Sequence, residues 1–236
     1  MSRTAVIAGV GPGMGASIAE RFAEEGCSVA LLARSEAYLD GLATRLDEQT
    51  AGKALAVPTD LAEPTDIEAA FAETREAFGG VDVLVNHASA ASWDGLLEQS
   101  TDDFRRAMAV GPEAAFRCSQ EAVSDMLDGD GGTVIFTGAT TSVRGRAGSV
   151  GFSAAKFACR GLAQSMAQEL GSESVHVAHV VLDGVIRPPE DVEDDAESYL
   201  DPDAIAERYW TLVEQSTDTM DFEVHLTNGN GTVEFL

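Results

Sequence analysis

Short apolar runs alternate along the chain with longer amphipathic stretches. The runs predict buried strands over residues 5–8, 29–33, 53–57, 81–85, 133–137, 175–182 and 222–226. Between them, apolar residues recur at helical spacing, which predicts a helix after the first strand and further helices over about 35–50, 64–78, 101–127, 152–170 and 202–215. This alternation predicts a Rossmann-type α/β fold, in which one doubly wound parallel sheet carries helices on both faces. No linker or repeat divides the chain, so we expect a single domain over residues 1–236.

A glycine-rich turn follows the first predicted strand. Its spacing is Gly9-x-x-x-Gly13-x-Gly15, with Gly11 between and Met14 where the commoner Gly-x-Gly-x-x-Gly pattern would end. Such a turn lets an anionic group approach the N-terminus of the next helix, where free N–H groups and the helix dipole favour negative charge. Inside a strand–turn–helix–strand unit it predicts a dinucleotide site. A plain turn with surplus glycine is the alternative.

The charge balance adds an expectation about the surface. The chain carries 15 basic and 40 acidic residues, a formal net charge of −25, yet 44% of its residues are hydrophobic. That apolar content argues against disorder, and we expect a folded, salt-adapted protein of a halophile, because high ionic strength screens its self-repulsion. The absence of a basic patch argues against a nucleic-acid partner.

The three cysteines, Cys27, Cys118 and Cys159, are odd in number and widely spaced. They predict reduced, mostly buried thiols rather than disulfides, and no group of His and Cys has the spacing of a metal site. No apolar run approaches the length of a membrane span, and the N-terminus lacks the pattern of a signal segment. We therefore expect a cytoplasmic protein with neither a metal nor a membrane partner.

Several motifs, in this order and spacing, resemble the short-chain dehydrogenase/reductase family along essentially the whole chain. They are the glycine turn, Asp60-Leu61, Asn86-His87-Ala88-Ser89, the strand before Gly138, Phe152-Ser153-Ala154-Ala155-Lys156 and Asp183-Gly184. The resemblance implies that Gly9, Gly11, Gly13, Met14 and Gly15 form the seat of the cofactor pyrophosphate. It also implies that Asp60 and Leu61 hold the adenine, that Asn86 begins the segment beside the ribose, and that Ile186 meets the nicotinamide amide.

Arg34 bears on the choice of cofactor. An acidic side chain at the end of the second strand would bind the ribose hydroxyls and repel a 2′-phosphate, but Ala33 has no carboxylate and Arg34 offers a fork of donors suited to phosphate. The sequence therefore predicts NADP(H) in preference to NAD(H). A surface arginine beside a helix is the alternative.

The catalytic positions depart from the family's pattern. The resemblance implies a tyrosine general acid four residues before Lys156, a serine thirteen residues before that tyrosine, and an asparagine on the preceding long helix. Here these positions hold Phe152, Ala139 and Gly111, none of which has a proton to give. Lys156 is kept, in a chain with only one other lysine, and we expect it to bind the nicotinamide ribose.

A relocated proton donor is an open alternative. Hydroxyls near the vacant serine position, such as Thr140, Thr141 and Ser142, are poor acids without an activating partner, and we expect them to brace the loop. His87 titrates in the useful range, but we expect it to pack against its neighbours rather than to catalyse.

Three hypotheses about function remain. The first is a variant NADP(H)-dependent oxidoreductase that moves hydride to or from an unidentified carbonyl or alcohol. The second is a non-catalytic NADP(H)-binding sensor or structural protein, and the third is a lyase or isomerase. By resemblance, residues 184–200 would be a substrate lid, and the last helix and strand would build a homodimer or homotetramer.

Overall fold

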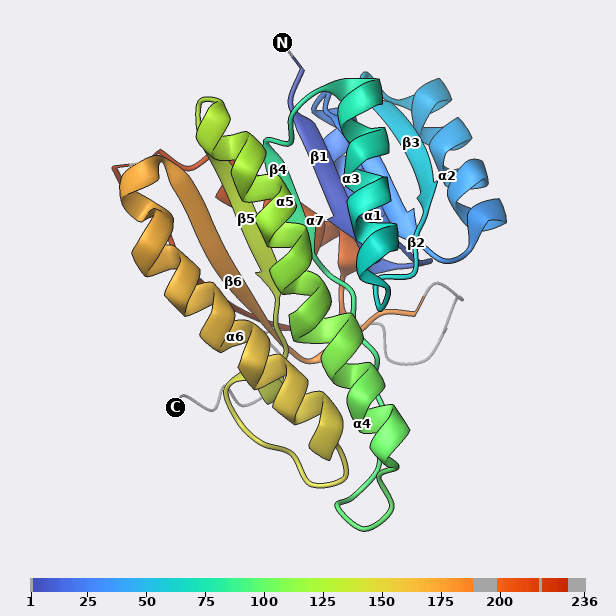
Figure 1. The fold of residues 1–236 in the computed structure, drawn as a ribbon, viewed down its shortest axis with the longest axis vertical. Helices are drawn as coiled ribbons and strands as arrows, with labels where there is room; N and C mark the ends of the chain where they lie inside the picture. Colours follow the sequence, from blue (N-terminus) through green and yellow to red (C-terminus); the bar gives the residue numbers. More distant parts are fainter. Residues whose placement is uncertain (1, 189–198, 217, 229–236) are drawn as a thin grey trace.

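The computed structural model describes residues 2–188, 199–216 and 218–228. Its centre is a parallel sheet of seven strands in the order β3-β2-β1-β4-β5-β6-β9 (Figure 1). The strands are β1 (Thr4–Ala8), β2 (Ser28–Ala33), β3 (Lys53–Pro58), β4 (Val83–Asn86), β5 (Gly132–Thr137), β6 (Val175–Asp183) and β9 (Glu223–Thr227). The predicted doubly wound α/β fold is confirmed.

Helices cover both faces of this sheet. One face packs against α1 (Met14–Glu24), α2 (Glu36–Gln49) and α7 (Pro202–Val213), and the other against α3 (Pro64–Phe78), α5 (Ala114–Asp128) and α6 (Val150–Leu170). Helices α3, α5 and α6 lie toward the viewer in Figure 1. Within β1, Ala5 and Ile7 face the first layer, Val6 faces the second, and all three side chains are fully buried. A strand buried on both faces reads as a continuous apolar run, which is why the runs predicted the strands well.

The sheet order reverses between β1 and β4. The chain passes from β1 outward through β2 to β3 and then returns to β4, which pairs with the other side of β1. Ala8 pairs with both Leu32 and Asn86, so the carboxyl ends of these strands lie at one edge of the sheet. Ligands of such folds bind in the crevice beyond this edge, where the order reverses.

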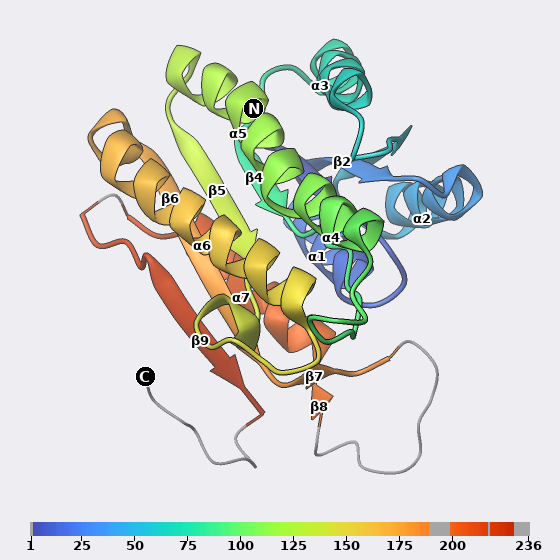
Figure 2. The same ribbon diagram turned by 60° about the horizontal axis from the view of Figure 1, so that its bottom comes forward.

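Two segments differ from the sequence prediction. The helical pattern over 101–127, which the sequence interrupts at Gly111-Pro112, forms two helices, α4 (Thr101–Met108) and α5, joined by a π-helical turn at Ala109–Glu113. Pro112 lies inside this turn and has no backbone N–H to donate, so the regular hydrogen-bond ladder is interrupted there. The stretch 184–200, expected by resemblance to be a substrate lid, contributes two short paired strands, β7 (Val185–Ile186) and β8 (Tyr199–Leu200), which lie apart from the main sheet in Figure 2.

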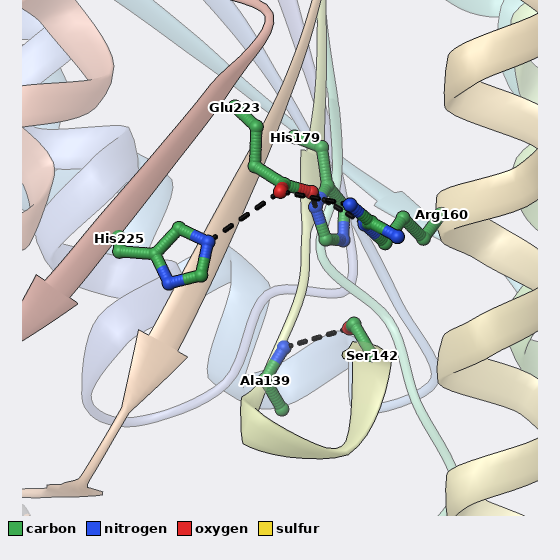
Figure 3. A network of polar contacts seen from close by, with 6 residues as sticks. All are labelled: Ala139, Ser142, Arg160, His179, Glu223 and His225. Atoms are coloured by element: carbon green, nitrogen blue, oxygen red, sulfur yellow. Dashed lines mark hydrogen bonds and ion pairs between the residues drawn. The ribbon is translucent and has the colours of Figure 1, made fainter. Parts of the chain in front are cut away.

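The edge strand β9 is fastened by a polar network shown in Figure 3. Glu223 accepts two hydrogen bonds from the Arg160 guanidinium of α6, at 2.5 and 2.9 Å, and one contact at 3.0 Å joins it to His179 of β6. His225, on the same strand as Glu223, lies 3.4 Å from its second oxygen. The hydrogen bond from Arg160 and the neighbouring histidine lower the pKa of Glu223 to about 2, although partial burial opposes this.

The structure also describes the state of the cysteines and the length of the apolar helices. Cys27, Cys118 and Cys159 are free and buried, as predicted, and burial raises the pKa of Cys118 to about 12. Within the described ranges, no helix is both long and apolar enough to cross a membrane. No three His, Cys, Asp or Glu side chains of these residues gather in a way that could hold a metal ion.

Candidate functional site: two clefts at the carboxyl edge of the sheet

The glycine turn joins β1 to α1 at the carboxyl edge of the sheet. Gly9 and Gly13 adopt φ values of 110° and 107°, in the left-handed region that favours glycine. A Cβ on Gly9 would lie 2.6 Å from the backbone of Ala88, and one on Gly15 would lie 2.9 Å from the carbonyl oxygen of Gly9. A Cβ on Gly11 would meet nothing within 4 Å. Gly9 and Gly15 are therefore needed for close packing of the turn, while Gly11 borders open space.

The first cleft opens directly above this turn and has a volume of about 390 Å³. Predicted cofactor residues on its wall are Gly9, Gly11, Met14, Gly15, Arg34, Asp60 and Leu61. Other lining residues are Val10, Pro12, Ala33, Thr59, His87, Ala88, Ser89, Ala90, Arg106 and Val110. Gly13 adjoins this wall as the residue before α1. The sequence thus located most of this cleft, because its residues follow the carboxyl ends of β1, β2, β3 and β4.

Two arginines at this cleft have no ion-pair partner among the described residues. Arg34 follows β2 and Arg106 lies on α4, and both side chains are exposed. Most other arginines of this acidic chain, such as Arg21, Arg75 and Arg160, are paired with carboxylates. Arg106 was missed at the level of sequence, because its helical phase relative to the cleft cannot be read from the pattern around it.

Asn86 does not reach the first cleft. Its side chain points to the opposite sheet face, where its Nδ2 donates to the Ser119 hydroxyl of α5 at 3.1 Å. Asn86 is 7% exposed, and its Oδ1 is buried without a hydrogen-bond partner. In this structure the hydrogen bond of Asn86 joins β4 to α5, whereas the next residues, His87 and Ala88, line the first cleft.

A second cleft, of about 550 Å³, lies beside the first and is mostly apolar. Its walls include Trp93, Thr137, Gly138, Ala139, Thr140, Thr141, Arg146, Phe152, Lys156, Leu182, Gly184, Val185 and Ile186. The rings of Trp93 and Phe152 lie 5.4 Å apart between centroids. Among the described residues, His87 and Ser89 line both clefts. The two clefts therefore meet at these residues, and predicted Ile186 and Lys156 belong to the second.

Lys156 is buried in the wall of the second cleft. Its side chain is 5% exposed, its Nζ donates to the backbone oxygen of Thr137 at 2.7 Å, and the ammonium lies 5.6 Å from the Phe152 ring centroid. Burial lowers the pKa of Lys156. The cation is therefore pre-positioned within the protein, where it can attract a hydroxyl or a negative oxygen.

The positions expected for the family's acid, Phe152, and for its serine, Ala139, both line the second cleft. The Gly111 position faces α6, where a Cβ would lie 3.4 Å from the Cβ of Ala155. None of the three has a side-chain donor. None of these three positions therefore supplies the proton donor that the resemblance implies.

The hydroxyls around Ala139 are mostly engaged elsewhere. Thr140 donates to Asp183 at 2.6 Å, and the Ser142 hydroxyl accepts from the backbone N–H of Ala139 at 3.0 Å (Figure 3). The Thr141 hydroxyl is buried without a partner. Arg144 also pairs with Asp183, at 3.3 Å. These bonds brace the loop after β5, in line with the expected bracing role.

His87 lines both clefts and is linked to buried hydroxyl groups of the protein interior. Its Nδ1 lies 3.2 Å from the Thr137 hydroxyl, which accepts a hydrogen bond from the buried Tyr209 of α7 at 2.9 Å. Burial and the charge of Lys156 lower the pKa of His87 to about 4, so the imidazole is neutral at physiological pH. Sequence reasoning missed Tyr209, because it lies 72 positions from Thr137 along the chain.

Comparisons with known proteins agree with this arrangement. A family model described as short chain dehydrogenase matches residues 3–193. The meso-2,3-butanediol dehydrogenase of Serratia marcescens is 32% identical over 179 residues, 76% of this chain and 70% of the relative. The 2-(R)-hydroxypropyl-CoM dehydrogenase of Xanthobacter autotrophicus is 31% identical over 192 residues, 80% of this chain and 76% of the relative.

Solved structures are similar along the whole length. An alcohol dehydrogenase of the archaeon Thermococcus sibiricus, complexed with 5-hydroxy-NADP, has a TM-score of 0.90 at 25% identity and covers 100% of both chains. The L-sorbose reductase of Gluconobacter frateurii, complexed with NADPH and L-sorbose, has a TM-score of 0.88 at 25% identity over 96% of this chain and 95% of the other. Because the matching family model spans both clefts and most of the sheet, the chain belongs to the short-chain dehydrogenase family of oxidoreductases.

Proposed function

We propose that this protein is an NADP(H)-dependent oxidoreductase that moves hydride between a cofactor in the first cleft and a carbonyl or alcohol in the second. The observation that carries the proposal is the meeting of the two clefts at His87 and Ser89. One cleft has a glycine turn shaped for a pyrophosphate, and the other is apolar with a buried cation at its base. Of the family's catalytic side chains, only Lys156 is kept.

The choice of NADP(H) over NAD(H) is supported by charge. Arg34 and Arg106 lack ion-pair partners in the described part of the chain, and Ala33 contributes no carboxylate that would repel a 2′-phosphate. The fork of N–H donors in a guanidinium group binds a phosphate better than it binds a ribose hydroxyl. The similar structures of the alcohol dehydrogenase and the L-sorbose reductase contain 5-hydroxy-NADP and NADPH, respectively.

The residues of the two clefts would bind different parts of the cofactor. The glycine turn would hold the pyrophosphate, and Asp60 and Leu61 would hold the adenine. Ile186 and Lys156 would hold the nicotinamide end. When bound, the nicotinamide would supply or accept the hydride. The apolar wall of the second cleft, with Trp93 and Phe152, would exclude water from the reacting carbon. The substrate class that this wall fits is a carbonyl or alcohol with an apolar body.

Turnover tests this proposal. Wild-type protein in high salt should oxidise NADPH in the presence of alkyl or aryl carbonyls, measured by loss of absorbance in the reduced nicotinamide band. The double variant Phe152→Tyr with Ala139→Ser restores the expected donors, and we expect it to be faster by about 10- to 10³-fold. No turnover in either protein, despite tight NADPH binding, would favour the second function below.

A non-catalytic NADP(H)-binding sensor or structural protein is the alternative function. It is favoured by the side chains of Phe152, Ala139 and Gly111, none of which is a proton donor at a position where the resemblance implies one. In that case NADPH binding would change an association or a conformation rather than a substrate. Turnover by the wild type separates the two functions, because only the oxidoreductase requires it. Activity that appears in the restoration variant alone would show a dormant site in a protein that is itself non-catalytic.

The proposal includes a homodimer or homotetramer in the cytoplasm of a halophile. Four large apolar side chains on α4, α5 and α6 are exposed: Phe104 by 38%, Phe116 by 47%, Leu127 by 48% and Phe157 by 43%. Helices α4 and α6 pack against each other, so we expect an interface between copies on these helices. Light scattering measures the oligomeric state. Unfolding at increasing KCl concentration tests salt adaptation, and a stability that does not rise with KCl would contradict it. The lid expected over 184–200 stays a prediction, since residues 189–198 lie outside the described part of the chain.

A further inference from the structure

The described chain has one titratable group at the point where the two clefts meet. A cofactor with its pyrophosphate at the glycine turn of the first cleft and its nicotinamide end at Ile186 and Lys156 of the second would cross this junction, so the groups at the junction would lie beside the reacting atoms. Of the two residues that line both clefts, Ser89 is exposed, whereas His87 is half-buried. We propose that His87 donates a hydrogen bond from Nε2 to the oxygen of the reacting carbonyl, in place of the absent tyrosine hydroxyl. This inference rests on the proposed function.

A chain of three hydrogen-bonding groups fixes which nitrogen of His87 carries the proton. Tyr209 is fully buried, and its hydroxyl donates to the Thr137 hydroxyl at 2.9 Å. The Thr137 hydroxyl has one proton of its own and one remaining neighbour, Nδ1 of His87, at 3.2 Å. When the Thr137 hydroxyl donates this proton to Nδ1, both the hydroxyl and Nδ1 have a hydrogen-bond partner. The neutral imidazole then carries its own proton on Nε2, the nitrogen left free to meet a ligand.

The surroundings of His87 keep it neutral and favour negative charge nearby. Thr137 of β5 contacts His87 directly, and the charge of Lys156 from α6 acts on it. Tyr209 of α7 and Lys156 both bond the same Thr137, through its hydroxyl and its backbone oxygen, respectively. The cation that suppresses protonation of His87 is also one that attracts a developing oxyanion. A neutral imidazole with a depressed pKa acts in this way as an electrophile in other enzymes. Pre-oriented donors of this kind are effective because they need no reorganisation during the reaction.

The chemistry balances without a proton from His87. In the reduction direction, a C–H bond forms as hydride adds to the carbonyl carbon, and the π electron pair of the carbonyl moves to its oxygen. The cofactor is thereby oxidised and the substrate reduced. The resulting alkoxide is held by Nε2–H and takes a proton from water, which leaves as hydroxide. His87 ends the step in its starting state, and Thr137 and Tyr209 act as positioning residues.

The tautomer is the first test, and it needs no turnover. Long-range ¹H–¹⁵N spectra of the full chain with labelled histidine report the tautomer of each imidazole, and His87→Gln identifies the signal of His87. We expect a neutral imidazole protonated at Nε2 at pH 7, and a mixture of tautomers in Tyr209→Phe. A signal protonated at Nδ1, or at both nitrogens, would overturn the inference.

The second test uses a probe ketone. Acetophenone added to the NADP⁺-bound protein should shift the Nε2–H resonance of His87; no shift of this resonance at saturating acetophenone would contradict the inference. In turnover of the best carbonyl found with NADPH, His87→Ala should lower kcat about 10²-fold. The Kd of NADPH should change less than threefold, and His87→Gln, which keeps an amide donor, should recover part of kcat.

The control is His225→Gln, an exposed histidine of β9 outside both clefts, which should behave as wild type. A tenfold weaker Kd for NADPH in His87→Ala with unchanged kcat would make His87 a cofactor ligand and refute the catalytic role. If wild type turns over no carbonyl, the proposed function fails, whereas the tautomer and the acetophenone shift still decide whether His87 presents a donor to a ketone.

Discussion

Replacing Arg34 with aspartate is the sharpest perturbation of cofactor choice. Arg34 is exposed at the end of β2, lines the first cleft and has no ion-pair partner among the described residues. The variant removes the guanidinium and places a carboxylate where a 2′-phosphate would lie. NADH has no such phosphate, so its ribose hydroxyls would gain an acceptor instead.

The expected magnitude follows from the exposure of this side chain. A hydrogen bond to a charged group contributes about 1.5–3 kcal/mol, and the lower end applies to Arg34 because solvent screens it. Repulsion between the new carboxylate and the phosphate adds about 1 kcal/mol, so the total change is about 2.5 kcal/mol. Since 1.4 kcal/mol corresponds to a factor of ten, the Kd of NADPH should rise about 50- to 100-fold. The Kd of NADH should stay the same or fall by a few fold.

Calorimetric titration of NADPH and NADH, at one high salt concentration, measures both constants. Arg208→Asp is the matched control, because Arg208 is an exposed arginine of α7 that lines neither cleft and has no ion-pair partner among the described residues. A ratio of the two Kd values that changes less than threefold in Arg34→Asp, with the fold intact by circular dichroism, would refute the role given to Arg34.

Three further predictions follow from the packing and the charges. Gly9→Ala should destabilise the fold by about 2 kcal/mol or more and abolish NADPH binding, because its Cβ would lie 2.6 Å from the backbone of Ala88. Gly11→Ala, whose Cβ would have nothing within 4 Å, should fold normally in thermal unfolding. Lys156→Met should lower turnover at least tenfold while leaving the unfolding temperature unchanged or higher, since it removes a buried ammonium; a lower unfolding temperature would contradict this. Glu223→Gln should destabilise the protein by about 1–3 kcal/mol at pH 7 in urea unfolding, because the Arg160 bond holds the pKa of this carboxyl near 2. Because the pKa of Glu223 is lowered, this stability is present above the ordinary pKa of 4.5 and is lost as the pH falls from there toward 2. A difference in unfolding free energy between wild type and Glu223→Gln that does not narrow on acidification would contradict this.

The sequence predicts the fold well because the patterns that define its strands, helices and glycine turn lie within short stretches of the chain. Strands buried on both faces must be apolar throughout, and the glycine turn shows its backbone requirement in its residue types. The same reasoning located the first cleft, since parallel strands carry their carboxyl-end loops to one edge of the sheet. The strand order and the cleft volumes depend on long-range packing that no local pattern encodes.

The side-chain directions at the site were harder to predict. Asn86 and His87 are consecutive, and successive side chains of a strand point to opposite faces, but the pattern does not say which of them faces the first cleft. The structure gives that place to His87 and turns Asn86 toward Ser119. Tyr209 lies far along the chain on α7, so its bond to Thr137 emerges only when the helix packs on the sheet.

Isotope transfer tests the central claim most directly. NADPH carrying deuterium at the transferable position is incubated in high salt with wild-type protein and a panel of apolar aldehydes and ketones, and the products are examined by mass spectrometry. The account predicts deuterium on the former carbonyl carbon of at least one product, at a rate that falls when Lys156 is replaced by Met. NADPH that binds at the first cleft but transfers deuterium to no member of the panel would contradict the assignment of this protein as an NADP(H)-dependent oxidoreductase.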